Sequence, residues 1–140
     1  MIPQDLGESP AIIDTDVFSF VVWNRGPYEW YESFLEHRYW VLSFATVAEL
    51  RYGALKANWG QERRNKLERR IRLCTVIPGG DVVATKWSEL YRQFADQVSV
   101  NDLWIAASAL SQNPTLPLIT NDAGLDRVAT AFGLAVVRKP

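Results

Sequence analysis

Short apolar segments alternate with helical patterns along this chain, and this alternation most limits what the chain can fold into. Runs that are apolar throughout, rather than at every second residue, are typical of strands buried on both faces. Parallel strands need a crossover between them, usually a helix. The pattern therefore predicts an α/β fold with a parallel sheet flanked by helices. The five expected strands are 11–13, 40–44, 73–77, 116–119 and 134–137.

Helical stretches fill the intervals between these strands, where apolar residues recur every three or four positions. Residues 1–10 contain Pro3, Gly7 and Pro10 and predict an irregular lead-in. Residues 11–140 contain no repeat, linker or low-complexity segment and predict a single domain of ordinary size. The expected helices are 17–22, 28–37, 47–55, 60–72, 82–98, 102–110 and 125–132.

Cysteine and histidine are scarce in this chain. One cysteine, Cys74, excludes an internal disulfide framework and a Cys-cluster zinc site. One histidine, His37, excludes metal sites of the HExxH type. A metal, if bound, must therefore be held mainly by oxygen. The chain has no apolar run of about 18 residues, and residues 1–10 lack the basic start of a secretory signal, so we expect a cytoplasmic protein with no membrane segment.

Four carboxylates fall where an α/β sheet binds ligands, beyond the carboxyl ends of its strands. Asp14 directly follows the first strand, and Asp122 lies three residues after the fourth. Glu49 and Asp102 stand among apolar neighbours in or at the start of helices. If the four converge, their charges need a counter-charge, which Mg²⁺ or Mn²⁺ supplies through oxygen ligands. Such an ion activates water and neutralises phosphate oxygens, so the acids predict phosphodiester hydrolysis.

Each acid taken alone also has a simpler interpretation. Asn101 or Asp102 can cap the helix that follows, and Asp16 can cap the first helix. Asp122 can likewise cap the last helix, and Glu49 can face water. The hypothesis of a metal site therefore depends on the joint position of the acids and not on any one of them.

The segments that carry these acids resemble the four motifs of PIN-domain proteins, in the same order. They are IIDTDVFS at 12–19, TVAELRYG at 46–53, NDLWIAA at 101–107 and LITND at 118–122. Their order, their spacing and the length of the chain resemble the bacterial VapC toxins, the small ribonucleases of toxin–antitoxin pairs. Each motif alone is weak, but four in order are a specific signal.

The resemblance implies a PIN-like three-layer fold with a parallel five-stranded sheet. It also implies an acidic pocket that binds one or two Mg²⁺ or Mn²⁺ ions and cuts RNA with metal-activated water. It further implies an antitoxin that inhibits the enzyme, and a homodimer. The catalytic and metal-binding residues that it implies are Asp14, Glu49, Asp102 and Asp122, with Thr120, Asp16 and Asn101 as candidates for orienting an acid or a water.

Two other functions compete with this one. The DTDV segment at 14–17 also fits the signature of haloacid-dehalogenase-like phosphatases, in which the first Asp attacks phosphate. That chemistry normally needs a lysine before the last acidic motif, and the chain has none between Lys86 and Lys139. A catalytically inactive PIN-like binding module is the second alternative. Loss of one of the four acids would favour it, and none is lost.

The formal net charge of −1 hides an uneven distribution along the chain. Residues 51–72 hold eight basic and two acidic side chains, a net +6, which leaves −7 for the rest. Arg63, Arg64 and Lys66 are candidates for contacting an RNA backbone. The alternative is a solvated helix with internal pairs such as Glu62 with Lys66.

Tryptophan is frequent, with six residues in 140. Trp23, Trp30 and Trp59 lie near helix ends or loops, where exposed aromatic rings favour interfaces. Core packing is the competing interpretation and the more common role of an aromatic side chain. The sequence leaves both interpretations open and favours core packing.

Overall fold

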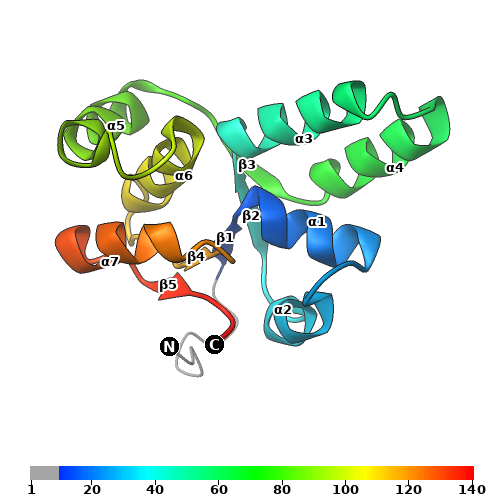
Figure 1. Ribbon diagram of the computed structural model, residues 1–140, viewed down its shortest axis with the longest axis horizontal. Coiled ribbons are helices and arrows are strands. Elements are labelled where there is room, and N and C mark those ends of the chain that lie inside the picture. Colours follow the sequence, from blue (N-terminus) through cyan, green and yellow to red (C-terminus); the bar gives the residue numbers. More distant parts are fainter. Residues whose placement is uncertain (1–9) are drawn as a thin grey trace.

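The computed structural model describes residues 10–140, and in it five short strands form one parallel sheet (Figure 1). The strands are β1 (Ala11–Ile13), β2 (Trp40–Ser43), β3 (Thr75–Ile77), β4 (Leu118–Ile119) and β5 (Val136–Val137), in the order β3-β2-β1-β4-β5. The α-helices are α1 (Thr15–Trp23), α2 (Tyr28–Leu35), α3 (Phe44–Lys56), α4 (Gln61–Arg72), α5 (Asp81–Phe94), α6 (Val100–Leu110) and α7 (Asp126–Phe132), and a 3₁₀ turn, η2, spans Ala123–Leu125. The predicted α/β fold with a five-stranded parallel sheet is confirmed.

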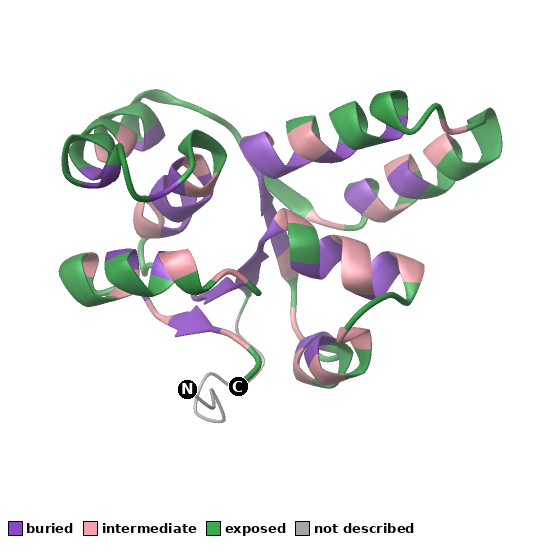
Figure 2. Ribbon diagram, viewed as in Figure 1, coloured by how far each residue is buried: buried purple, intermediate pink, exposed green. Residues whose placement is uncertain are grey.

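Each face of the sheet is covered by its own set of helices (Figure 1). Successive side chains of a strand point to opposite faces, so each strand contributes to two cores. Ile12 of β1 packs in the core under α5, α6 and α7. Ile13, the next residue, packs in the core under α1, α2 and α4 with most of α3. Figure 2 shows the buried residues gathered on the sheet and on the helix faces turned toward it. These are the three layers that the sequence predicts.

Three strands begin two residues later than predicted, β4, β5 and β3, and β3 differs in its burial as well. It begins at Thr75 and not at residue 73, because Leu73 and Cys74 still donate backbone hydrogen bonds to the last turn of α4. It is also an edge strand, and its first two residues, Thr75 and Val76, are exposed. The expectation of strands buried on both faces is therefore wrong for β3 and right for the inner strands.

The register of the inner strands places their carboxyl ends at one edge of the sheet. Ile13 of β1 lies beside Ile119 of β4. The ladder continues past both strands, because the Asp14 N–H donates to the Ile119 carbonyl and the Thr120 N–H to that of Val137, at 2.9 and 3.0 Å. Two separate motifs of the sequence thus come side by side through backbone pairing alone.

Two predictions concern features outside this core. The lead-in predicted for residues 1–10 lies, apart from Pro10, outside the described residues. Within residues 10–140, no helix combines the length and the apolar character that crossing a membrane requires.

Candidate active site

The site begins with Asp14, whose side chain is only 4% exposed at the junction of β1 and α1. The Thr120 hydroxyl donates a hydrogen bond of 2.5 Å to its Oδ2. Burial, opposed by that hydrogen bond and reinforced by the negative charges of Asp16 and Glu49, raises the pKa of Asp14 to about 6. A buried carboxyl with acidic neighbours is costly to ionise, which is typical of functional sites.

Asp102 enters the same site from the first turn of α6. Burial, reinforced by the charge of Asp14 and a hydrogen bond with Asp122, raises the pKa of Asp102 to about 7. The helix is capped by Ser99, whose hydroxyl accepts a hydrogen bond of 3.2 Å from the Asp102 N–H. Capping by Asn101 or Asp102 is therefore wrong as an interpretation. The Asp102 carboxyl is left to the site, whereas Asn101 is exposed in the same turn.

Asp122 has two functions in the loop that follows β4. Its Oδ1 accepts a hydrogen bond of 2.8 Å from the Gly124 N–H, so Asp122 does act as a cap, but of the η2 turn that precedes the last helix, α7. Its own N–H donates to the Thr120 hydroxyl at 3.0 Å. The Thr120 hydroxyl thus bonds Asp14 on one side and the backbone of Asp122 on the other, and it fixes the two acids relative to each other.

Glu49 and Asp16 complete the acidic group from α3 and α1. The Thr15 hydroxyl donates a hydrogen bond of 2.7 Å to Glu49 Oε1, so Glu49 does not simply face water. Partial burial raises the pKa of Asp16, and the charges of Glu49 and Asp122 raise it further. Asp14 occupies the N-cap position of α1, so Asp16 is not the cap. All five predicted acids therefore gather at the carboxyl edge of the sheet.

Whether a metal ion fits this acidic group depends on the charge of the five acids and on the spacing of their side chains. No Lys or Arg within residues 10–140 forms an ion pair with any of the five acids. In that same part of the chain, no three His, Cys, Asp or Glu side chains are spaced to hold an ion together. A closed cage of carboxylates therefore does not fit. A Mg²⁺ ion that keeps several waters and is bound through one or two carboxylates does fit.

Tyr31 is a residue of the site that the sequence motifs do not indicate. It lies fully buried on α2, and its hydroxyl donates to Asn121 Oδ1 at 2.8 Å and lies 3.1 Å from the Thr120 carbonyl oxygen. The Tyr31 hydroxyl oxygen also accepts a hydrogen bond of 3.1 Å from the Lys139 N–H. A buried tyrosine needs partners for its hydroxyl, which is a signal in the sequence, but the identity of those partners depends on the fold.

A groove runs from the acidic group between α1 and the α3–α4 hairpin, with a volume of about 420 Å³. Thr15 and Glu49 line it, as do Trp23, Trp59, Arg25 and Arg63. Arg63 therefore lines the groove. Arg64, the next residue, lines a separate cavity of about 250 Å³ together with Gln61. The structure thus does not bring the three predicted RNA-contacting residues onto one surface.

The three tryptophans for which the sequence leaves both core and interface open pack against the core beneath α1 and α2. Trp23, Trp30 and Trp59 are half-buried against that core. The rings of Trp23 and Trp59 meet edge to face, with centroids 4.9 Å apart. Core packing, which the sequence favours, thus describes all three, although each retains some exposed surface.

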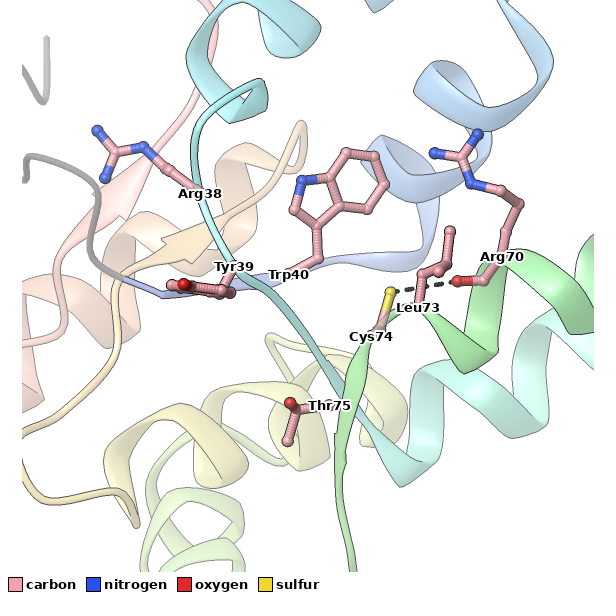
Figure 3. A pocket seen from close by; sticks show the side chains of 7 residues that line it. All are labelled: Arg38, Tyr39, Trp40, Arg70, Leu73, Cys74 and Thr75. Carbon is pink, nitrogen blue, oxygen red and sulfur yellow. Dashed lines mark hydrogen bonds between the residues drawn. The ribbon is translucent and has the colours of Figure 1, made fainter.

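A further cavity, of about 220 Å³, lies at the opposite edge of the sheet, where β2 and β3 begin (Figure 3). It contains no acid, and Arg38 and Arg70 lie on opposite sides of Trp40 (Figure 3). The Cys74 thiol donates to the Arg70 carbonyl at 3.5 Å, and burial raises the pKa of that thiol to about 11. A neutral thiol has little reactivity, so this cavity holds none of the chemistry of the acidic edge.

Comparisons with known proteins agree with the four motifs. The PIN-domain family profile matches residues 11–131. The chain is 34% identical over 98 residues to "Ribonuclease VapC5" of Mycobacterium tuberculosis. The aligned segment covers 66% of this chain and 71% of that protein.

Two solved structures of toxin–antitoxin complexes are similar along nearly the whole chain. VapBC-5 of Mycobacterium tuberculosis matches with a TM-score of 0.71 and 29% identity, over 93% of this chain and 98% of that chain. VapBC2 of Rickettsia felis, bound to a DNA fragment from its promoter, matches with a TM-score of 0.74 and 21% identity, over 92% of this chain and 98% of that chain. At 21% identity the second comparison shows the fold alone.

Proposed function

Since the chain belongs to the PIN-domain family, we propose that it is a metal-dependent endoribonuclease and the toxin of a type II toxin–antitoxin pair. One observation carries the proposal. Acids from four separate motifs meet at one edge of the sheet, and no cation of residues 10–140 is paired with them. The names of the similar proteins, a ribonuclease and a toxin–antitoxin system, support the substrate and the biological role.

In this proposal Asp14, Glu49, Asp102 and Asp122 would hold Mg²⁺ or Mn²⁺, one or two of them directly through a carboxylate oxygen and the others through bound waters. The ion supplies an activated water and neutralises charge on the phosphate oxygens. Thr120 fixes the orientation of the Asp14 carboxylate through its hydroxyl. Hydrolysis adds one water across the phosphodiester. A new O–P bond forms, the P–O bond to the leaving ribose oxygen breaks, and that oxygen takes a proton.

The partners in the proposal are RNA, a cognate antitoxin and a second copy of the chain. We expect the antitoxin to present an Arg or Lys side chain to the acidic group, where it would replace the missing counter-charge. Expression of the chain alone should arrest growth, and co-expression of the small protein it binds should restore it. A harmless chain that binds no such protein would refute the toxin role. Light scattering on the purified chain should give the mass of two copies.

The nuclease activity is tested with an Asp14→Asn variant. Wild type should cut structured RNAs in Mg²⁺ or Mn²⁺ and stop when the ion is chelated, whereas Asp14→Asn should be inactive. Asp96→Asn is the matched control, because Asp96 is an exposed aspartate on the surface after α5. Equal cleavage by Asp14→Asn and Asp96→Asn, or cleavage that survives chelation, would refute the proposal.

The same assay separates the two alternatives. A haloacid-dehalogenase-like phosphatase should release phosphate from small esters, and an inactive binding module should show no metal-dependent turnover. Neither alternative gains support from the comparisons, which lead to the PIN-domain family and to a ribonuclease.

A further inference from the structure

The groove beside Glu49 follows one face of each of two helices. Thr15, Ser19 and Trp23 of α1 line it at intervals of four residues, and Glu49, Gly53 and Ala57 line it at the same interval from α3 to its C-cap. Residues four apart lie on the same face of a helix. From Thr15 to Trp23 the groove is therefore about 12 Å long, at 1.5 Å of rise per residue. It leads from the acidic group to the paired indoles.

Basic side chains surround the indole end of this groove. The Arg63 guanidinium lies 4.7 Å from the ring centroid of Trp59 and 5.5 Å from that of Trp23. The Lys66 ammonium lies 4.7 Å from the Trp23 centroid, and Arg25 lines the same end. Within residues 10–140, none of these three cations has an acidic partner. Their charge is thus available to a ligand.

The middle of the groove is open and lined by small residues. A Cβ atom built on Gly53 would meet nothing within 4 Å, and Ala54 and Ala57 also line the groove. The volume of about 420 Å³ is within the roughly 300–1,000 Å³ of pockets that hold a drug-sized ligand. One nucleotide is a ligand of that size. The groove therefore has room for one between its acidic and its basic end.

We propose that this groove is a subsite for unpaired RNA. A base next to the scissile phosphate rests on Trp23 and Trp59, and the other phosphate of that nucleotide is neutralised by Arg63 and Arg25. The inference rests on the proposed nuclease function, because it assumes that a phosphate is held at the acidic group. Bases stack on aromatic side chains only when they are unstacked from a duplex, so the subsite selects single-stranded segments. Stacking accepts any base, so it gives the groove little sequence preference.

RNA fits these observations better than a peptide does. A nucleic acid strand carries a phosphate at every nucleotide, so one strand meets the metal at one end of the groove and the arginines at the other. The strand also carries one base for each phosphate, and a base can stack on the exposed surface of the indole rings. The Arg or Lys that we expect from the antitoxin meets only the acidic end, and a peptide in the groove would need an acidic side chain at the arginines as well.

The experiment compares Arg63→Ala with Arg64→Ala. The two residues are neighbours on α4, but Arg64 faces the other cavity and donates to Gln61 Oε1 at 3.3 Å. Binding of a fluorescent, unstructured oligoribonucleotide of about ten nucleotides is measured by anisotropy, in the Asp14→Asn background with chelator present so that the RNA stays intact. Trp59→Leu, which keeps an apolar side chain, tests the stacking, and circular dichroism verifies that each variant is folded.

We expect Arg63→Ala and Trp59→Leu each to weaken RNA binding about tenfold, the size of one lost stacking or phosphate contact. Arg64→Ala should bind within about twofold of its parent, since it loses no groove contact. In the cleaving protein, Arg63→Ala should raise KM and leave kcat nearly unchanged, because the groove binds the substrate away from the reacting bond.

Two results would overturn the inference. One is equal RNA affinity for Arg63→Ala, Trp59→Leu and Arg64→Ala. The other is unchanged RNA binding together with loss of a co-purifying protein from the Arg63→Ala variant, which would make the groove a protein-binding surface. Because binding is measured without cleavage, a wild-type chain that binds RNA through the groove but never cuts it would refute the proposed function and support the subsite.

Discussion

The two ends of the groove have opposite charge, and the chain produces each of them in a different way. At the end near Thr15 and Glu49, carboxylates from four separate segments are brought together by the sheet register and by hydrogen bonds from hydroxyl groups. At the other end, the cations Arg63 and Lys66 come from a single helix and are held only against indole rings. The acidic end depends on the tertiary fold, whereas the basic end is mostly local.

This difference determines how much each end of the groove lowers the stability of the protein when no metal is bound. The raised pKa values of Asp14 and Asp102 mean that the fold disfavours their charged forms, which a bound cation would offset. The cations at the indole end are exposed, and water solvates them at little cost. We therefore expect large effects from changes at the acidic end and small, salt-dependent effects at the basic end.

The largest effect expected is on catalysis by Asp102→Asn. The change removes a carboxylate of the acidic group but keeps its shape, and we expect the rate of RNA cleavage to fall at least about 100-fold, the upper limit for groups that only orient metal ligands. The measurement is single-turnover cleavage across a range of Mg²⁺ concentrations. A loss below tenfold at saturating Mg²⁺ would show that Asp102 supports the site without taking part in it.

The next effect concerns stability in the absence of metal. The pKa of Asp14 is raised from 3.8 to about 6, so the folded state holds this proton more tightly than the unfolded state does. Its contribution to stability is complete below about pH 4 and is lost as the pH rises through 6. Relative to Asp14→Asn, wild type should therefore lose on the order of 2–3 kcal/mol of unfolding free energy between pH 4 and pH 8.

Urea unfolding of both proteins in chelator at the two pH values measures this difference. Mg²⁺ added at pH 8 should restore stability to wild type and not to Asp14→Asn, because ligand binding to the folded state stabilises it. A difference between the two proteins that is the same at both pH values would mean that Asp14 is not destabilised by its surroundings.

The same contrast explains how much of the molecule can be predicted from its sequence. Asp14 and Asp122 are found because they lie one and three residues after an apolar run, and parallel strands end at a common edge. Glu49 is a candidate because of its apolar neighbours and its motif, but its contact with Thr15, which spans 34 residues of sequence, depends on the fold. The cap of α6 is missed because Ser99, Asn101 and Asp102 are all good capping residues, and only the backbone decides among them.

Positions that depend on side-chain packing are beyond sequence patterns. Arg63 and Arg64 are indistinguishable in a run of charges, yet they line different cavities because each residue turns by about 100° around the helix. Tyr31 is one of several aromatic residues in its segment, and its partners lie 89 to 108 residues away. Its importance follows from three elements that meet at one hydroxyl group.

Tyr31→Phe should have an intermediate effect. It keeps the buried ring and removes the hydroxyl that holds the loop of Thr120 and Asn121. We expect about a tenfold lower cleavage rate with a higher Mg²⁺ requirement, as for groups that orient metal ligands, and a loss of unfolding free energy of about 1 kcal/mol. Tyr91→Phe is the control, because Tyr91 is 39% exposed on α5. An unchanged Mg²⁺ requirement with lower stability would reduce Tyr31 to a structural role.

The smallest effect expected is at the basic end, in the salt dependence of RNA binding. Arg25 is exposed beyond the end of α1, where screening by ions weakens any single contact, so Arg25→Ala should reduce affinity only about threefold at physiological salt. The slope of log affinity against log salt should decrease by about one, since one fewer counterion is released. Arg92→Ala on α5 removes an equally exposed arginine far from the groove and should leave the slope unchanged. Equal slopes for both variants would mean that the charge at the indole end acts only as part of the general field of the protein. A change confined to Arg25→Ala would show that this end contacts phosphate directly, as the acidic end is proposed to do through its metal ion.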